Sequence, residues 1–215
     1  MRPAQPASTD PAIVVVPANE ATWEDIAAIF GTRGEAAACW CQRYKLAPRE
    51  AFRSWPAEVR ADRLRRQTGC GDPAATATTG LVASLGGVPA GWCAVEPRAH
   101  YEGLRRVYRV PWLGRDEDKA DTGVWAVTCL FTRAGYRRQG VSRALARAAV
   151  AFARERGARA LEGYPMATTP GEDIAWGELH VGSRSVFADA GFREVGRPTP
   201  RRFVMRIAFA GATTI

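Results

Sequence analysis

A buried strand runs directly into a glycine-containing turn and then into a long amphipathic helix. Residues 124–132 (VWAVTCLFT) are apolar nearly throughout, which predicts a strand that is buried on both faces. The turn 133–140 (RAGYRRQG) ends in Gly140, after which an alanine-rich helical pattern begins. The apolar positions of this pattern step by four, three and four, as on one face of a helix: Val141, Leu145, Ala148 and Phe152.

The start of this helix has the properties of an anion site. Helix N-termini carry unpaired backbone N–H groups and the positive end of the helix dipole, and glycine lets a phosphate approach the backbone closely. Arg137 and Arg138 can add charge-assisted hydrogen bonds. The alternative is a solvated basic face on an ordinary helix, but cations at this end gain nothing from the dipole. The dinucleotide motif G-x-G-x-x-G and the nucleotide motif G-K-[ST] are both absent from the turn.

The remaining pattern alternates strands and helices in the order β-α-α-β-β-β-α-β-α-β-β, without an internal repeat. We expect long connections at 101–121 and 166–181, which inside a compact domain are usually functional or disordered. The expected elements are a strand in 12–20, a helix at 23–30 capped by Thr22, helix on either side of Pro56 within 48–69, two strands in 79–97, a strand at 160–166, a helix in 182–192 and one or two strands in 193–209.

Composition narrows the class of protein. The 215 residues suit one domain, 12–215, behind a disordered tail, 1–11, that lacks the apolar centre of a signal peptide. No apolar run is long enough to span a membrane, so we expect a cytoplasmic protein without a membrane partner. The net charge of +8 favours polyanionic partners, but it does not separate a nucleic acid from a phosphate-rich cofactor.

The five cysteines form no disulfide framework. Cys39 and Cys41, with Cys70, could supply three zinc ligands, but the usual CxxC spacing is missing. We therefore expect buried free thiols and no metal site.

At residues 137–142 (RRQGVS) the chain resembles the GNAT superfamily of N-acetyltransferases, whose acetyl-CoA signature is [Q/R]-x-x-G-x-[G/A]. The preceding TRAGYRR is similar to the family segment V-x-P-x-Y-R-G, and SVFADAGFREVGR (185–197) is similar to the family's last helix. The likeness covers nearly all of 12–209 and implies an α/β (α+β) GNAT fold. That fold has a central, mixed, mostly antiparallel sheet of about seven strands, flanked by about four helices.

The resemblance also implies how acetyl-CoA binds. The backbone of Leu130, Phe131 and Thr132 would pair with the pantetheine amides, and the acetyl group would lie where strands 124–132 and 160–166 diverge. The N–H groups around the helix start would hold the pyrophosphate. The residues of this cradle are Arg137, Arg138, Gln139, Gly140, Val141, Ser142 and Arg143.

Three positions depart from the family pattern. Ser142 replaces a glycine or alanine but is still small. Phe187 stands where many members place a tyrosine that protonates the departing thiolate, and phenylalanine donates no proton. His180 stands where an asparagine is frequent.

Acetyl transfer to an amine needs a base, close positioning of the reactants and a donor for the oxyanion. Our candidates for proton transfer are Tyr164 as the acid and Glu162 or His180 as the base. Glu172, Asp173 and Glu178 are further carboxylates in the loop 166–181. Each candidate also has a plainer interpretation. The carboxylates can be ordinary surface charges, His180 can simply form a hydrogen bond, and Tyr164 can be an aromatic residue at an interface. A buried structural role is expected for Cys129, because the superfamily mostly transfers the acetyl group directly.

The sequence says least about the acceptor, the molecule that receives the acetyl group. The connection 101–121 combines aromatic residues with acidic ones (Asp116, Glu117, Asp118, Asp121), which suits a cationic amine unless the loop is simply solvated. We expect Tyr108, Trp112 and Glu178 to contact the substrate, with the segment around Trp40 as another pocket wall or as core.

These residues favour an N-acetyltransferase that acts on a primary amine of a small molecule, such as an antibiotic, a polyamine or an amino-acid derivative. Two alternatives stay open. One is acetylation of a macromolecular amine: a protein N-terminus, a lysine or, with weaker support from the charge, aminoacyl-tRNA. The other is a non-catalytic acetyl-CoA-binding module, for which Phe187 is the best argument. The sequence leaves the oligomeric state open, a homodimer being one option.

Overall fold

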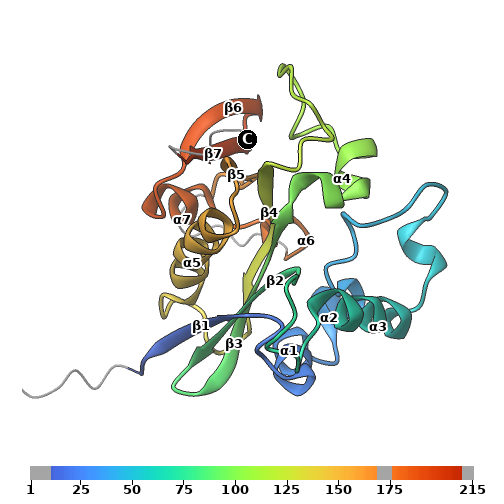
Figure 1. Cartoon of the computed structure of the whole chain (residues 1–215), viewed down its shortest axis with the longest axis vertical. Helices are drawn as coiled ribbons and strands as arrows, with labels where there is room; N and C mark the ends of the chain where they lie inside the picture. The colour runs from blue at the N-terminus through green and yellow to red at the C-terminus, as the bar shows by residue number, and fades with distance from the viewer. Residues whose placement is uncertain (1–10, 169–175, 210–215) are drawn as a thin grey trace, which may run out of the picture.

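The computed structural model describes residues 11–168 and 176–209 (Figure 1), so the expected tail lies outside the described residues except for its last member. One seven-stranded sheet runs through the molecule in the order β1-β2-β3-β4-β5-β7-β6. Only β4 and β5 pair in parallel, and this confirms the predicted mixed, mostly antiparallel sheet. The strands are β1 Ile13–Pro17, β2 Gly80–Leu85, β3 Val88–Pro97, β4 Val124–Thr132, β5 Ala160–Gly163, β6 Arg193–Thr199 and β7 Arg202–Ala208.

Helices lie on both sides of this sheet, and in the described residues they are more numerous than the four expected because several are very short. None of them combines the length and apolar character needed to cross a bilayer. They are α1 Trp23–Phe30, α2 Gly34–Cys39, α3 Ala57–Thr68, α4 Glu102–Arg106, α5 Val141–Glu155, α6 Trp176–Leu179 and α7 Arg184–Asp189, with 3-10 turns at Phe52–Ser54 and Arg98–His100.

Thr22 caps α1 as predicted. Its hydroxyl accepts from the N–H of Asp25 at 3.1 Å, and the Asp25 carboxylate accepts from the N–H of Thr22 at 3.3 Å. This reciprocal pair satisfies two donors at the helix start. The helix expected after Pro56 is confirmed as α3, with Gly69 as its C-cap, but the helix expected before Pro56 is only the 3-10 turn Phe52–Ser54.

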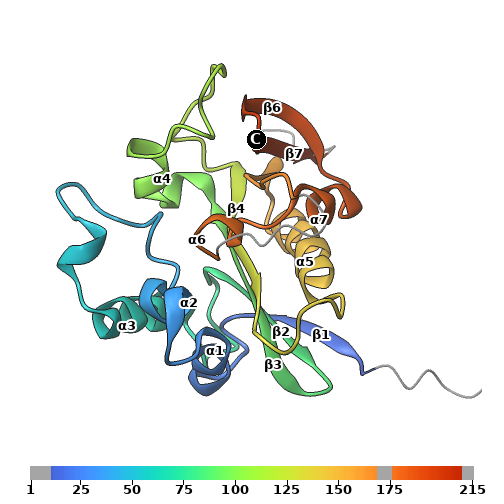
Figure 2. The ribbon, with the colours of Figure 1, turned by 180° about the vertical axis from the view of Figure 1, so that it is seen from behind.

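Each face of the sheet has its own core. α5 and α7 cover one face, and α1, α2 and α3 cover the other (Figures 1 and 2). Leu130, Leu145 and Phe187 belong to the first core, whereas Trp40 and Trp92 belong to the second. As expected, the cysteines are free thiols, and all but Cys70 are buried.

α5 lies close against the sheet because Gly91 of β3 has no side chain. A Cβ at Gly91 would come within 2.6 Å of Val141 Cγ1 and 2.9 Å of Leu145 Cδ1. The predicted apolar stripe needs one correction: Ala149 is fully buried and Ala148 is only half-buried. The first turn of the helix is thereby held directly behind strands β3 and β4.

β4 parts from β5 halfway along its length. The parallel pairing ends at Val127 opposite Gly163, while β4 continues to Thr132. A bulge marks this point, because Ala94 opposes Cys129 but Val95 opposes Val127, which leaves Thr128 as an extra residue. The bulge resets the alternation of side chains, so that Leu130 packs in the same core as Val127. The sheet is therefore open beside the last residues of β4.

Candidate functional site

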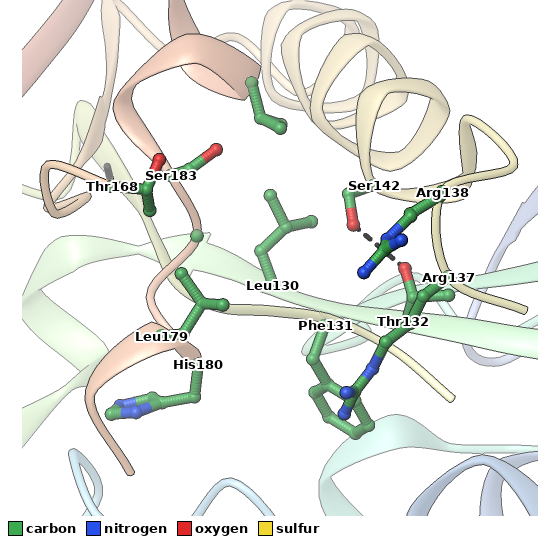
Figure 3. Close-up of a pocket in the computed structure, with 12 residues that line it drawn as sticks. Leu130, Phe131, Thr132, Arg137, Arg138, Ser142, Thr168, Leu179, His180 and Ser183 are labelled. Carbon is green, nitrogen blue, oxygen red and sulfur yellow. Dashed lines mark hydrogen bonds between the residues drawn. The ribbon is translucent and has the colours of Figure 1, made fainter. Parts of the chain in front are cut away.

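A cavity of about 510 Å³ lies at this opening (Figure 3). Arg137, Arg138 and Ser142 lie on one side of it and His180 on the opposite side, with Leu130 between them. The cavity thus has a cationic end and an apolar middle. Its wall consists of Leu130, Phe131, Thr132, Arg137, Arg138, Ser142, Thr168, Leu179, His180, Gly182, Ser183 and Val186.

The cationic end is formed by the start of α5. Gly140, the N-cap residue, and Arg138 both have left-handed backbone conformations, with φ of 85° and 63°. No acidic residue occurs in the first helical turn. The Ser142 hydroxyl lies 2.9 Å from the Thr132 hydroxyl, which joins the helix start to the end of β4. Unpaired N–H groups, two arginines and two hydroxyls together can bind a diphosphate.

The structure divides the ten residues predicted to bind acetyl-CoA into two groups. Six predicted residues line the cavity: Leu130, Phe131, Thr132, Arg137, Arg138 and Ser142. The side chains of the other four have different surroundings. Gln139 donates to the carbonyl of Gly135 at 3.2 Å, and the Arg143 guanidinium pairs with Asp189 at 2.6 Å. Val141 packs in the core, and Gly140 has no side chain.

His180 is held at the opening by its own backbone. Its carbonyl oxygen accepts a hydrogen bond from the N–H of Leu130 at 2.7 Å. This N–H was expected to pair with pantetheine, but it already has a partner within the chain. The imidazole is buried, and its Nε2 lies 3.3 Å from the hydroxyl oxygen of Tyr44. The segment that carries His180 therefore extends the sheet locally beyond the end of β5.

A second, smaller cavity of about 170 Å³ lies on the other side of His180. His180 lines both cavities, so this residue lies where the two spaces meet. The wall of the second cavity consists of Arg43, Tyr44, Leu104, Tyr108, Val110, Pro111, Tyr164, Gly177, His180, Val181 and Arg202.

Tyr44 is a site residue that the sequence did not reveal. Tyr44 lies between His180 and Tyr108. The ring centroids of Tyr44 and Tyr108 are 4.6 Å apart. Burial, followed by the neighbouring Tyr108, raises the pKa of Tyr44 well above its usual value, so its hydroxyl keeps its proton. In the segment around Trp40, residues 39–44, Arg43 and Tyr44 line the second cavity, whereas Trp40 stacks on Trp23 and Phe30 in the core.

Glu162 lies in neither cavity. It is fully buried within a group of arginines, 3.0 Å from Arg98, 2.5 Å from Arg115 and 3.2 Å from Arg206. Burial raises the pKa of Glu162, but the hydrogen bond and charge of Arg115 and the charges of Arg98 and Arg206 outweigh it, so the pKa is below its usual value. A carboxylate so neutralised is a weak base, and its observed contacts are structural.

Tyr164 lines the second cavity with its ring, but its hydroxyl points into the same cluster. The hydroxyl donates to Glu162 Oε2 at 3.0 Å. Burial, and next the charge of Glu162, raises the pKa of Tyr164 well above its usual value. Tyr164, the predicted acid, therefore lines the cavity, but its hydroxyl proton is already donated to Glu162.

None of the four carboxylates expected to attract a cationic amine lines either cavity, and two of the four are already paired with arginines. Glu117 pairs with Arg98 at 3.2 Å, Arg115 at 2.8 Å and Arg206 at 2.9 Å, and Asp121 pairs with Arg159 at 2.7 Å. These carboxylates fasten the loop to the sheet.

Of the three predicted substrate residues, Tyr108 lines the second cavity, and Trp112 and Glu178 line neither of the two cavities. Trp112 donates from its indole to the carbonyl of Leu104 at 3.1 Å and is covered by Arg98, whose guanidinium carbon lies 4.8 Å from the ring centroid. Glu178 pairs with Arg201 at the surface, at 3.2 Å. Glu172 and Asp173 lie outside the described residues.

The mixed sheet opens beside the N-terminus of a helix, and a cationic cavity lies at that point. This arrangement defines an acyltransferase fold that binds a diphosphate-containing cofactor. The family model "Acetyltransferase (GNAT) family" matches residues 40–170, more than half of the chain, and the protein belongs to this family. The family uses acetyl-CoA as its acetyl donor, so the chain is an acetyl-CoA-dependent acetyltransferase by family. No curated protein sequence matches it.

Solved structures agree with the fold. One is yncA, a putative acetyltransferase from Salmonella typhimurium with its cofactor acetyl-CoA, which is 15% identical with a TM-score of 0.52. The match covers 95% of this chain and 99% of that one. Another is a GCN5-related N-acetyltransferase from Kribbella flavida, 18% identical with a TM-score of 0.50, covering 92% and 98%.

Proposed function

We propose that the protein is an N-acetyltransferase that moves an acetyl group from acetyl-CoA directly to a primary amine of a small molecule. The observation that carries this proposal is that His180 lines both the large cavity and the small one. A single imidazole between the two spaces can take a proton from an acceptor in the small cavity beside a donor in the large one.

The large cavity fits acetyl-CoA by the chemistry of its wall. Arg137, Arg138 and the N–H groups at the start of α5 would bind the diphosphate, and Leu130, Leu179 and Val186 would contact the less polar pantetheine arm. When bound, the cofactor supplies an acetyl group activated as a thioester.

The proton chemistry falls to His180 and Tyr44. An amine reacts only when uncharged, and a neutral imidazole can accept a proton, so His180 is the group suited to take the amine proton. Tyr44 keeps its own proton and, at 3.3 Å from Nε2, orients the ring. Of the two candidate bases, His180 thus keeps that role, whereas the polar atoms of Glu162 and Tyr164 contact each other.

The size of the small cavity favours a small acceptor over a macromolecular one. Its volume of about 170 Å³ is a third of that of the donor cavity. Acetylation of a protein N-terminus, a lysine or aminoacyl-tRNA stays the alternative. Phe187 was the argument for a non-catalytic module, but it is fully buried in the core and lines neither cavity.

The test is release of CoA thiol from acetyl-CoA over a panel of primary amines, together with calorimetry of CoA binding. We expect micromolar-range CoA binding and turnover of at least one small amine. Tight CoA binding without turnover of any amine would indicate the binding module. Turnover of peptides or aminoacyl-tRNA alone would indicate the macromolecular acceptor.

A further inference from the structure

The small cavity is cationic, contrary to what its position next to an amine-binding site would lead one to expect. Two arginines, Arg43 and Arg202, line it, and no carboxylate is among its wall residues in the described part of the chain. Both arginines are half-buried. Such a wall repels an acceptor that carries only positive charge.

Neither guanidinium is neutralised by the chain in the regions that the structure describes. Arg202 donates from Nη1 to the carbonyl of Glu178 at 3.3 Å, and Arg43 lies over the Phe52 ring at 5.5 Å. No ion pair joins either of them to a carboxylate within 11–168 or 176–209. Arg201, the neighbour of Arg202, does pair with Glu178, at 3.2 Å, but outside the cavity. Half-buried cations without a counter-ion leave room for an anion from a ligand.

The arginines come from two separate elements. Arg43 follows α2, and Arg202 begins β7, yet both reach the cavity that His180 closes on its other side. An acceptor in this small space therefore meets the proposed base and two guanidiniums at once. Its amine and its anionic group must be separated by only a few bonds.

We propose that the acceptor is a small amino acid, with a carboxylate near its primary amine, and that Arg43 and Arg202 bind this carboxylate. This inference rests on the proposed N-acetyltransferase function and names the substrate class of that site. The apolar part of the wall, Leu104, Val110 and Pro111, is then available to the side chain of the amino acid. A planar guanidinium matches a carboxylate in two-point hydrogen bonding, which makes arginine suited to this recognition.

The test uses matched sets of acceptors: the common α-amino acids, their carboxamides and their decarboxylated amines, with aminophosphonates and taurine as other anions. CoA thiol release is measured with each compound. We expect turnover of at least one amino acid, with kcat/KM at least about tenfold above that of its amide, since a charge-assisted contact is lost. Thermal shift without acetyl-CoA gives a second readout, in which the same amino acid raises Tm and its amide does not.

Two variants assign the effect to the arginines. Arg43→Gln and Arg202→Gln should each raise KM for the amino acid by about 10- to 100-fold, with kcat little changed. Their melting temperatures and their CoA affinities should stay as in the wild type, which shows that the variants are folded. Arg202→Lys should recover part of the loss, and Arg201→Gln, the matched control, should change none of these values.

The outcomes separate the two proposals. Equal or better turnover of amides and decarboxylated amines overturns the amino-acid acceptor and keeps the N-acetyltransferase. Turnover confined to aminophosphonates or taurine overturns the carboxylate as the recognised anion. No thiol release with any compound in the sets overturns both proposals.

Discussion

The N–H of Leu130 donates to the carbonyl oxygen of His180 at 2.7 Å, and this bond joins the free edge of β4 to the segment before α7. It holds the histidine just beyond the point where β4 and β5 separate at Val127 and Gly163. The main chain thereby fixes this residue between the two cavities, and its Nε2 lies 3.3 Å from the Tyr44 hydroxyl.

Replacing His180 with glutamine should lower kcat by about 100-fold or more, because a positioned base contributes that much to proton transfer. CoA affinity, measured by calorimetry, should change little. The limb of the pH–rate profile that reports this base should disappear. His100→Gln is the control, since His100 is the other histidine of the chain and is exposed. Equal rates for the two variants would refute the role of His180.

Replacing Arg138 with alanine should weaken CoA binding by about tenfold, because a charge-assisted hydrogen bond to the diphosphate is lost. The loss should shrink as salt is raised, since screening weakens the contact in the wild type as well. Arg147→Ala is the matched control: it lies on the exposed face of α5, away from the cavity. Calorimetry measures the CoA affinity of both variants at two salt concentrations. Identical affinities for the two variants would contradict the proposed cradle.

Replacing Glu162 with glutamine should lower the free energy of unfolding by about 3–5 kcal/mol at pH 7, because three arginines lose a buried counter-ion. The folded-state pKa of Glu162 is lowered, so its contribution is present above its unfolded pKa and is lost as pH falls through the folded value. The difference between wild type and variant should therefore narrow below pH 4.5, the ordinary pKa of glutamate.

Denaturant melts of both proteins from pH 7 to pH 3 measure this difference. Glu178→Gln serves as the control, since its surface pair with Arg201 is worth at most about 1 kcal/mol. A difference for Glu162→Gln that stays constant over the whole pH range would show that its ionisation is not what stabilises the fold.

The buried cysteines should not react with alkylating agents in the native protein. Burial raises the pKa of Cys93 and, together with the neighbouring Cys41, that of Cys129, so neither thiol forms a thiolate near neutral pH. Mass spectrometry after native treatment with iodoacetamide at pH 8 should find the label at Cys70, which is half-buried. The Cys129→Ala variant should still release CoA thiol from acetyl-CoA, because direct transfer needs no acetylated cysteine. An acetylated Cys129 trapped during turnover would contradict direct transfer.

Long, uninterrupted patterns made the fold readable from the sequence. The apolar run 124–132 became β4 because such a run is stable only when covered on both sides. Gly140 became the N-cap of α5, and both arginines before it line the cavity. The cationic half of the site was thus accessible from local signals alone.

The acceptor side was not accessible, because it depends on contacts between distant residues. Tyr44 reaches His180 from 136 positions away, after two left-handed residues, Trp40 and Cys41, that no local pattern announces. The ion pairs of the acidic loop were not predictable for the same reason: Glu117 contacts Arg206, which lies 89 positions away in the sequence. Charge patterns in sequence show which residues are ionised, but only the tertiary fold determines which of them are already paired.

Gly91 shows that the donor cavity can be altered from a residue that never touches it. Any side chain there would push the first turn of α5 outward, and with it the hydroxyl of Ser142 that lies against Thr132. Random mutagenesis that selects for altered cofactor use should therefore return substitutions at Gly91 of β3, beneath Val141 and Leu145 of α5. Engineers who want a wider donor site have a place to begin.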